Sequence, residues 1–305
     1  MKSPHLLSIS DMNTEDIVSL VTSAVEGKKD PWTDMLSRKT LAILFEKPSS
    51  RTRVSFEVAM RQLGGETIYL SQAEVGLGTR ESVPDVARVL GRYVDIIAAR
   101  TYTHRTVEEL AEYAGVPVIN ALSDYEHPCQ ILADLLTIYE KKGALKGITL
   151  AYIGDGNNVA NSLLLAAALT GMNFRIASPE GYSIAGPVIE KARIFATASG
   201  AQLSLTSQPE EAVENADVVY TDVWASMGQE DEAELRQTVF AGYQVNSGLM
   251  SLARKDALFM HDLPAHRGQE VTDEVMESPQ SVIFDQAENR LHAQRELLIR
   301  LGSGR

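Results

Sequence analysis

The residues best suited to chemistry in this chain form the turn SSRTR at positions 49–53. An apolar run at positions 41–45 precedes the turn, and apolar residues with helical spacing follow it from Phe56 to Leu63, which predicts a strand, a turn and a helix. Backbone N–H groups and the positive end of the helix dipole converge at such a turn. The guanidinium group of Arg51 adds donors that match phosphate oxygens, so a site for a small dianion is predicted. The alternative is a surface loop with incidental arginines.

Two other polar residues stand at the ends of predicted strands in the first half of the chain. Arg100 follows the predicted strand 95–99, and His127, in the stretch YEHPCQ, follows the predicted strand 117–120. Strands that alternate with helices predict a parallel sheet with right-handed crossovers, in which ligands bind beyond the carboxyl ends of the strands. We therefore expect the turn, Arg100 and His127 to face one crevice.

The second half of the chain repeats the alternation from the predicted strand 148–153 onward. The sequence GDGNN at 154–158 is an incomplete dinucleotide fingerprint, because Val159 occupies the third glycine position. A small-ligand hydrogen bond from Asn157 or Asn158 is one alternative, and a helix cap is the other.

Acidic residues follow two predicted strands of this half. Asp222 follows the strand 218–221, where its carboxylate could pair with an ammonium group or cap a helix. The stretch HDLPAHRGQEV at 261–271 holds two histidines near acids, but their spacing matches no usual zinc pattern, so no metal site is expected. Cys129 is expected to be packed rather than nucleophilic.

Length and composition favour a soluble α/β protein of two domains. The chain has 305 residues, which is long for one core, and we expect a doubly wound parallel sheet in each of the domains 1–142 and 143–305. Its net charge of −13 gives little attraction to nucleic acid or to anionic membranes. The first residues resemble neither a signal peptide nor a transmembrane segment. A lone cysteine excludes an intrachain disulfide and fits a reducing compartment.

Taken together, these stretches resemble the aspartate/ornithine carbamoyltransferase family over essentially the whole chain. SSRTR is similar to the carbamoyl-phosphate motif STRTR, with Ser50 in place of a threonine, and HPCQ at 127–130 is similar to the motif HPxQ. DVWASMG at 222–228 is similar to the loop DxxxSMG that holds ornithine in one branch of the family. HDLPAHRG is similar to HCLPAHRG, but this chain has Asp262 where the family has cysteine.

The resemblance implies a role for each matching residue. In the first half it implies binding of carbamoyl phosphate through Ser49, Ser50, Arg51, Thr52, Arg100, His127 and Gln130. In the second half it implies binding of the amine substrate through Asn158, Asp222, Ser226, Met227 and Leu263. The catalytic residues it implies are Asp262, Arg290, Arg100 and His127. Arg290 would reach the site from a last helix, 287–301, that packs back on the first domain.

These implications predict transfer of a carbamoyl group to the δ-amine of L-ornithine, giving L-citrulline and phosphate, with no cofactor. Asp262 leaves two alternatives open. One is a carbamoyltransferase for another amine, such as putrescine, lysine or an acylated ornithine, and the other is a non-catalytic protein that binds carbamoyl phosphate. The resemblance also implies a cytoplasmic homotrimer, or a multiple of trimers. In that assembly Arg80, in a polar segment at 71–81 predicted to be a mobile loop, would contact a neighbour's site.

Overall fold

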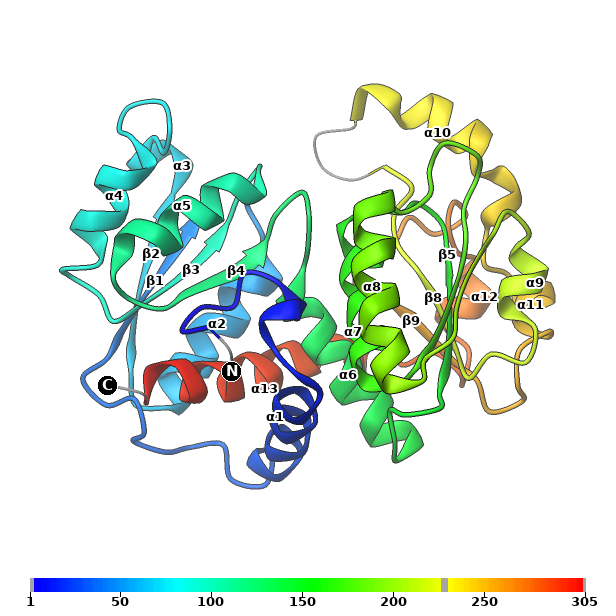
Figure 1. The fold of residues 1–305 in the computed structure, drawn as a ribbon, viewed down its shortest axis with the longest axis horizontal. Coiled ribbons are helices and arrows are strands. Elements are labelled where there is room, and N and C mark those ends of the chain that lie inside the picture. The colour runs from blue at the N-terminus through cyan, green and yellow to red at the C-terminus, as the bar shows by residue number, and fades with distance from the viewer. Residues whose placement is uncertain (1–2, 226–229, 304–305) are drawn as a thin grey trace. The chain divides into compact units, whose positions relative to one another are not determined.

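The computed structural model describes residues 3–225 and 230–303, which fold into two compact units (Figure 1). Unit 1 comprises Met1–Leu136 together with Glu288–Arg305, and unit 2 comprises Thr137–Ala287. The division falls within two helices, α6 (Pro128–Lys142) and α13 (Ile283–Gly302). The end of α13 therefore belongs to the same unit as the start of the chain.

Unit 1 is built on a parallel sheet in which the strands lie in the order β2-β1-β3-β4. Its strands are β1 (Thr40–Phe45), β2 (Glu66–Ser71), β3 (Ile96–Arg100) and β4 (Val118–Leu122). Its other helices are η1 (Ile9–Asp11), α1 (Thr14–Gly27), α2 (Ser50–Gln62), α3 (Gln72–Val75), α4 (Val83–Leu90) and α5 (His104–Ala114). The strand order reverses between β1 and β3, which is the place where ligands bind in open α/β sheets.

The two faces of this sheet are covered by different helices, with α4 and α5 on one face and α2 and α13 on the other (Figure 1). Side chains alternate between the faces of a strand, so Ala42 and Leu44 of β1 join a buried cluster with Val86 of α4 and Leu110 of α5. The buried residues Leu41 and Ile43 of β1 alternate with these and have the opposite face available. Both faces of the sheet are thus apolar, as expected for a doubly wound unit.

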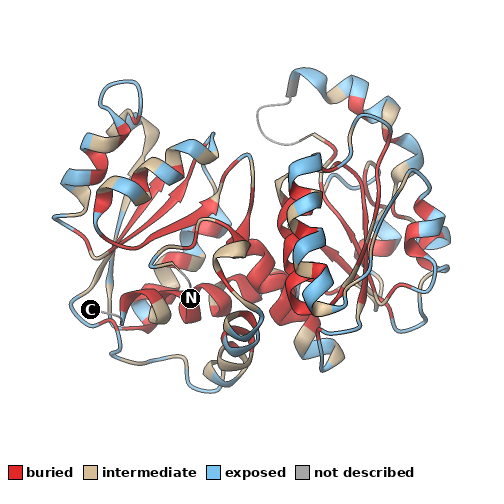
Figure 2. Ribbon diagram, viewed as in Figure 1, coloured by how far each residue is buried: buried red, intermediate tan, exposed pale blue. Residues whose placement is uncertain are grey.

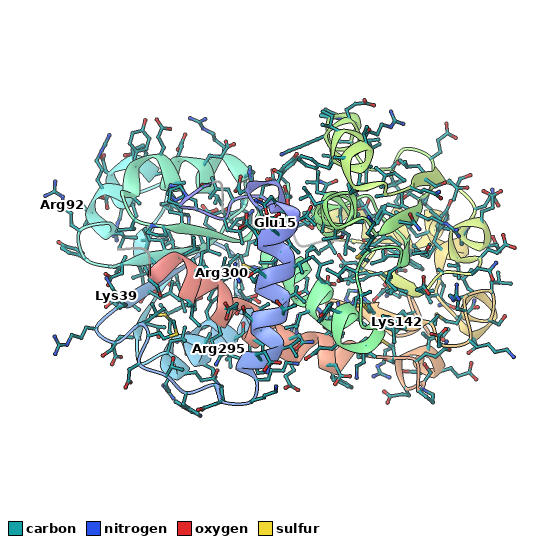
Figure 3. The ribbon with its side chains drawn as sticks, turned by 60° about the horizontal axis from the view of Figure 1, so that its bottom comes forward. Glu15, Lys39, Arg92, Lys142, Arg295 and Arg300 are labelled. Carbon is teal, nitrogen blue, oxygen red and sulfur yellow. The ribbon has the colours of Figure 1, made fainter. Side chains whose placement is uncertain are left out.

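The helix α13 also holds α1 in place (Figure 3). Arg300 donates a hydrogen bond of 2.9 Å to Ser19 Oγ of α1, and Arg295 donates one of 2.8 Å to the carbonyl oxygen of Pro31. A side chain at Gly27 would begin 1.7 Å from the guanidinium of Arg295. A Cβ at position 27 would therefore displace the buried guanidinium of Arg295.

The start of the chain is more ordered than its sequence indicates. Leu6 forms a parallel bridge with Ile119 of β4 and accepts a hydrogen bond of 2.8 Å from the N–H of Asn120. Glu126, which is fully buried, accepts hydrogen bonds from Ser8 Oγ at 2.5 Å and from the N–H of Ile9 at 3.0 Å. Glu126, the residue before His127, thus connects η1 to the segment after β4.

The polar segment 71–81, expected to be a loop, contains regular structure. It contains α3, which begins with a capping box between Ser71 and Glu74 and ends at Gly76 in the left-handed region. A bridge then joins Leu77 to Glu81. Local hydrogen bonds between short polar side chains and the backbone, rather than apolar periodicity, form this structure.

Unit 2 repeats the same architecture with a parallel sheet in the order β7-β6-β5-β8-β9. Its strands are β5 (Thr149–Ile153), β6 (Asn173–Ala177), β7 (Leu203–Thr206), β8 (Val218–Thr221) and β9 (Leu258–His261). Its other helices are α7 (Asn158–Thr170), α8 (Gly186–Ser199), α9 (Pro209–Val213), η2 (Glu230–Glu232), α10 (Ala233–Val239), η3 (Ala241–Tyr243), α11 (Ser247–Met250) and α12 (Asp273–Met276). Here the order reverses between β5 and β8. The predicted pair of doubly wound parallel-sheet units is thus confirmed.

The helices α6, α7 and α13 are largely buried (Figure 2). In α7 every residue from Val159 to Thr170 is buried, in agreement with a helix that is apolar on all sides. Across residues 3–225 and 230–303, the helices are too short or too polar for any of them to span a bilayer.

Candidate functional site

The predicted anion turn lies between β1 and α2, at the carboxyl end of unit 1's sheet. Ser49 is the N-cap of α2, with an extended backbone at φ −157° and ψ 109°, and its Oγ accepts a hydrogen bond of 3.3 Å from the N–H of Thr52. The first N–H groups of a helix lack acceptors one turn back, and here Ser49 satisfies those of Thr52 and Arg53. The start of α2 is nonetheless suited to binding an anion, as helix N-termini are.

The two arginines of SSRTR have different environments. Arg51 is an exposed residue in the first turn of α2. Arg53 instead donates from Nε to Glu57 at 2.7 Å, and its guanidinium lies 3.9 Å from the centroid of the Tyr69 ring. Arg53 is thus engaged on the side of α2 that faces β2, and Arg51, at the turn itself, is the predicted anion ligand.

Arg290 of α13 connects the turn to the HPCQ stretch. Its Nη2 donates to Thr52 Oγ1 at 3.1 Å and its Nη1 donates to Gln130 Oε1 at 2.6 Å. Gln130 in turn donates from Nε2 to Asp134 Oδ1 at 2.8 Å, which fixes the orientation of the amide. All four side chains are buried, so the network is shielded from water and its geometry is well defined.

His127 and Arg100 belong to the same end of the sheet. His127 directly precedes α6 and is 3% exposed, and burial, followed by the charges of Arg290 and Arg100, holds its pKa well below the usual 6.5. The imidazole is therefore neutral at neutral pH and can donate one hydrogen bond from a ring N–H. Arg100 is itself 6% exposed, and the register of β3 and β4 shifts between Ala99 and Arg100. Such a bulge changes the direction of a side chain next to a site.

A link between the turns after β1 and β3 has no signal in the sequence. Glu46 accepts a hydrogen bond of 2.7 Å from the N–H of Tyr102, and Lys47 Nζ lies 4.7 Å from the centroid of the Tyr102 ring. Burial raises the pKa of the Glu46 carboxyl, and the hydrogen bond from Tyr102 opposes that shift. These contacts fix the anion turn relative to Arg100.

Cys129, the lone cysteine, is packed as expected. It is 1% exposed, its Sγ lies 3.4 Å from the carbonyl oxygen of Asn120, and burial raises the pKa of its thiol to about 12. A thiol in this state is not a nucleophile at neutral pH.

In unit 2, the two asparagines of GDGNN take separate roles. Asn157 caps α7, accepting hydrogen bonds of 3.0 Å from the N–H groups of Val159 and Ala160. Its Nδ2 donates to Asp222 Oδ2 at 2.7 Å, so Asp222 is not a helix cap but is held by the neighbouring turn. Asn158 is the half-buried first residue of α7. The turns after β5 and β8 therefore meet at the reversal point of this sheet.

His261 closes β9 in a fixed tautomer. Its Nδ1 accepts a hydrogen bond of 2.9 Å from the N–H of Leu263, so Nε2 carries the proton and donates to Glu270 Oε1 at 3.2 Å. Ligand atoms of Asp222, His261 and Asp262 lie within 4.8 Å of one another, as in some metal sites. However, the hydrogen bond from Leu263 already occupies Nδ1, the nitrogen that lies 3.5 Å from Asp262 Oδ1. Binding of a metal by all three residues would require this bond to break.

Asp262 lies close to Asp222 at the carboxyl end of the sheet of unit 2, and Leu263 follows it in the chain. The Asp262 side chain is 13% exposed. Leu263 has φ +61°, a strained value for a leucine that is typical of functional sites. Tyr152 is fully buried, and burial, followed by Asp222, Asp155 and Asp262, raises its pKa well above 10. The local charge in unit 2 is therefore negative, which suits a cation. Ser226 and Met227, the other predicted ligands, lie outside the described residues.

Comparison with known proteins identifies the family. The model for the carbamoyl-P binding domain of aspartate/ornithine carbamoyltransferases matches residues 4–140, and the model for the Asp/Orn binding domain matches residues 146–301. The chain belongs to the aspartate/ornithine carbamoyltransferase family. The resemblance inferred from its motifs is thus confirmed.

Similar proteins cover nearly the whole chain. An ornithine carbamoyltransferase from Anoxybacillus flavithermus is 54% identical over 306 residues, which span 99% of this chain and 97% of the relative. A relative from Pyrococcus furiosus named as the anabolic ornithine carbamoyltransferase is 53% identical over 96% of this chain and 94% of its own length. The solved structure of ornithine carbamoyltransferase from Pyrococcus furiosus superimposes with a TM-score of 0.96 at 52% identity, covering 99% of this chain and 97% of that one.

Proposed function

We propose that this protein is an ornithine carbamoyltransferase, which transfers the carbamoyl group of carbamoyl phosphate to the δ-amine of L-ornithine and releases L-citrulline and phosphate. The observation that carries the proposal is the network through which Arg290 joins Thr52 of the anion turn to Gln130 of HPCQ. It brings the family's two carbamoyl-phosphate motifs together at one end of a sheet. The acidic end of unit 2 supplies the complementary charge for a diamino acid.

In this proposal carbamoyl phosphate binds to unit 1, within domain 1–142. The phosphate is held by Ser49, Ser50, Arg51 and Thr52, and Arg100 bridges the phosphate and the carbonyl oxygen. His127 and Gln130 hold the carbamoyl end, and Arg290 stabilises the carbonyl or phosphate side. Because His127 is neutral, it acts as a hydrogen-bond donor rather than as an imidazolium acid. Negative charge grows on the carbonyl oxygen and on the leaving phosphate, and preorganised donors at these positions supply the largest catalytic contribution.

L-Ornithine binds to the domain 143–305. Asp222 pairs with the α-ammonium group, and Asn158, Ser226 and Met227 hold the α-carboxylate. Leu263 and Asp262 face the δ-amine. That amine must lose a proton, because a free alkylamine has a pKa of about 10.4. Asp262 is the proposed proton acceptor. The hydrogen bond from the N–H of Leu263 to His261 Nδ1 fixes the backbone next to Asp262.

Citrulline formation by the purified protein tests the proposal. Incubation with carbamoyl phosphate and L-ornithine should release citrulline and phosphate in equal amounts. Faster turnover with putrescine, lysine or an acylated ornithine would show that this amine, rather than ornithine, is the substrate. Binding of carbamoyl phosphate with no turnover on any of these amines would identify a binding protein instead.

We also propose that the protein is a cytoplasmic homotrimer or a multiple of trimers. Support comes from β2, an edge strand of unit 1, where Ile68 is 47% exposed, and from α2, where Val54 is 56% exposed. Exposed apolar residues along a sheet edge are typical of a surface that another chain covers. Arg80 is the candidate residue for contact with a neighbour's site. Sedimentation that shows a fully active monomer would contradict the trimer.

A further inference from the structure

Unit 2 contains a buried ion pair to which the proposed reaction assigns no role. Arg236 of α10 donates from Nη1 to Asp155 Oδ2 of the GDGNN turn at 2.9 Å. The two side chains are 7% and 11% exposed. Removing two charges from water costs several kcal/mol per ion, so a buried pair adds little to stability, and its importance lies in what it positions.

The other contacts of Arg236 show what the pair connects. The same Nη1 donates to the carbonyl oxygen of Trp224 at 2.9 Å, and Nε donates to Glu232 Oε2 at 2.9 Å. The guanidinium also lies 4.9 Å from the centroid of the Tyr182 ring. One planar group therefore holds the turn after β5, through Asp155, and the segment after β8, through Trp224.

The same two segments are joined a second time at the proposed substrate site. Asp155 precedes Asn157 by two residues, and Trp224 follows Asp222 by two residues. The hydrogen bond of 2.7 Å from Asn157 Nδ2 to Asp222 Oδ2 is the second connection. Asn157 also caps α7, whose first residue is Asn158. Displacement of either segment at the ion pair would therefore move Asp222 relative to Asn158.

Aromatic packing makes the ion pair a rigid support. Phe240, at the end of α10, lies 4.9 Å from the ring of Tyr182 and 5.9 Å from the ring of Trp224, measured between centroids. The guanidinium therefore lies against the ring of Tyr182, which packs in turn on Phe240, as well as against its acceptors. A lysine at position 236 would keep the charge but could not reproduce the planar fork or the stacking.

We propose that Asp155 and Arg236 are positioning residues for the amine substrate, which set the spacing of Asp222 and Asn158 without contacting the substrate. The inference rests on the proposed function and adds to it a determinant of amine affinity outside the family's motifs. The electrostatics favour this arrangement: burial raises the pKa of Asp155, Arg236 opposes the shift, and Asp222 and Glu232 add to it. Arg236 thus offsets the negative charge of Asp155, which lies close to Asp222.

The test compares Asp155→Asn and Arg236→Lys with Arg193→Gln as a control. Arg193 of α8 pairs with Glu190 at the surface of the same unit, with side chains 62% and 67% exposed. Citrulline formation is measured with ornithine varied at saturating carbamoyl phosphate, and then with carbamoyl phosphate varied. Both variants should raise the ornithine KM by about tenfold or more, as expected for misplaced binding groups. Their kcat and their KM for carbamoyl phosphate should stay within about twofold of wild type, as should all parameters of Arg193→Gln.

Several outcomes would overturn the inference. They are an unchanged ornithine KM in folded variants, an equal rise in both KM values, and a loss of kcat alone. Thermal melting and equilibrium dialysis with carbamoyl phosphate establish that each variant is folded. If the single variants do not fold, the double variant Asp155→Asn/Arg236→Gln removes both charges, and a wild-type ornithine KM in that protein would also overturn the inference. A wild-type protein that makes no citrulline would instead overturn the proposed function.

Discussion

The carboxyl ends of the two sheets share a topology but carry opposite charge. In unit 1 the strand order reverses between β1 and β3, and Arg51, Arg100 and Arg290 gather there with hydroxyl and amide groups. In unit 2 the order reverses between β5 and β8, and Asp222 and Asp262 gather there. The comparison shows that strand order determines where a ligand binds, whereas the residues just after each strand determine the charge of the binding site.

The two ends also differ in how their side chains are held. In unit 1 a residue from the last helix, Arg290, bonds directly to two proposed ligands, Thr52 and Gln130. In unit 2 Asn157 bonds directly to Asp222, and Asp155 and Arg236 support that contact from one step further away. We therefore expect the largest losses of activity from changes in unit 1 and more selective effects from changes in unit 2.

The strongest test of the cationic end is Arg51→Ala. Loss of a charged hydrogen bond to a desolvated phosphate should cost roughly 2–5 kcal/mol, by analogy with buried charge pairs. Turnover should fall below detection and carbamoyl-phosphate binding should weaken, as measured by citrulline assay and equilibrium dialysis. Arg51→Lys should also be poor, because a point charge cannot replace a fork. Arg61→Ala, in the last turn of the same helix, is the control. Wild-type kinetics in Arg51→Ala would remove the basis of the assignment.

The corresponding test of the acidic end is Asp222→Asn. The variant keeps the shape of the side chain but loses the anion for the α-ammonium group, so the ornithine KM should rise by about a hundredfold, at the level of a lost charge pair. Carbamoyl-phosphate binding should persist, because that ligand is proposed to bind to unit 1. Wild-type enzyme should strongly prefer ornithine to putrescine, which lacks both α-groups. Equal catalytic efficiency on the two amines would contradict the role of Asp222.

Asp262→Asn tests whether the acidic end also takes part in the chemistry. Loss of a general base should lower kcat by more than about tenfold, a threshold below the usual contribution of about 10²- to 10⁴-fold for such groups. Asp262→Cys should restore the family's residue and remain active. The measurement is kcat from about pH 6 to about pH 9 at saturating substrates. Asp262→Asn with wild-type rates over that range would show that the residue only binds or packs.

The smallest expected effect concerns the protonation of His127. Its pKa in the folded state lies well below the value of about 6.5 in the unfolded chain. At pH values between these two pKa values, the unfolded chain binds a proton that the folded chain excludes. Stability should therefore fall as the pH drops through about 6.5, by at most about 1.4 kcal/mol per pH unit. In denaturant titrations His127→Gln should lose this component, whereas His266→Gln, which changes an exposed side chain, should keep it. Parallel pH profiles of wild type and His127→Gln would refute the burial argument.

Much of this comparison could be read from the sequence, because strand ends are visible in apolar periodicity. The positions of Ser49, Arg100, His127, Asp222 and Asp262 after predicted strands follow from that periodicity and from the rule that ligands bind there. The family resemblance added Arg290, but not the atoms with which it bonds.

Contacts between residues distant in sequence could not be predicted. Asp155 and Arg236 are 81 positions apart, and neither interrupts a local pattern. Glu126 and Ser8 are 118 positions apart, and a buried glutamate cannot be distinguished from a surface one by composition. The different environments of Arg51 and Arg53 depend on Tyr69, which belongs to the next strand. Such contacts are properties of the packed structure rather than of any single segment.

The buried thiol of Cys129 makes unit 1 its own reporter of opening. Reagents such as maleimides react with exposed thiolates, so the native molecule should stay unlabelled and each modification should record one transient exposure of α6. Because the chain contains no other cysteine, the labelled mass identifies the event without any engineered probe. Cys129 also lies between His127 and Gln130, so carbamoyl phosphate should slow the labelling in proportion to its occupancy. The rate of a simple alkylation thereby measures how often the proposed carbamoyl-phosphate site opens.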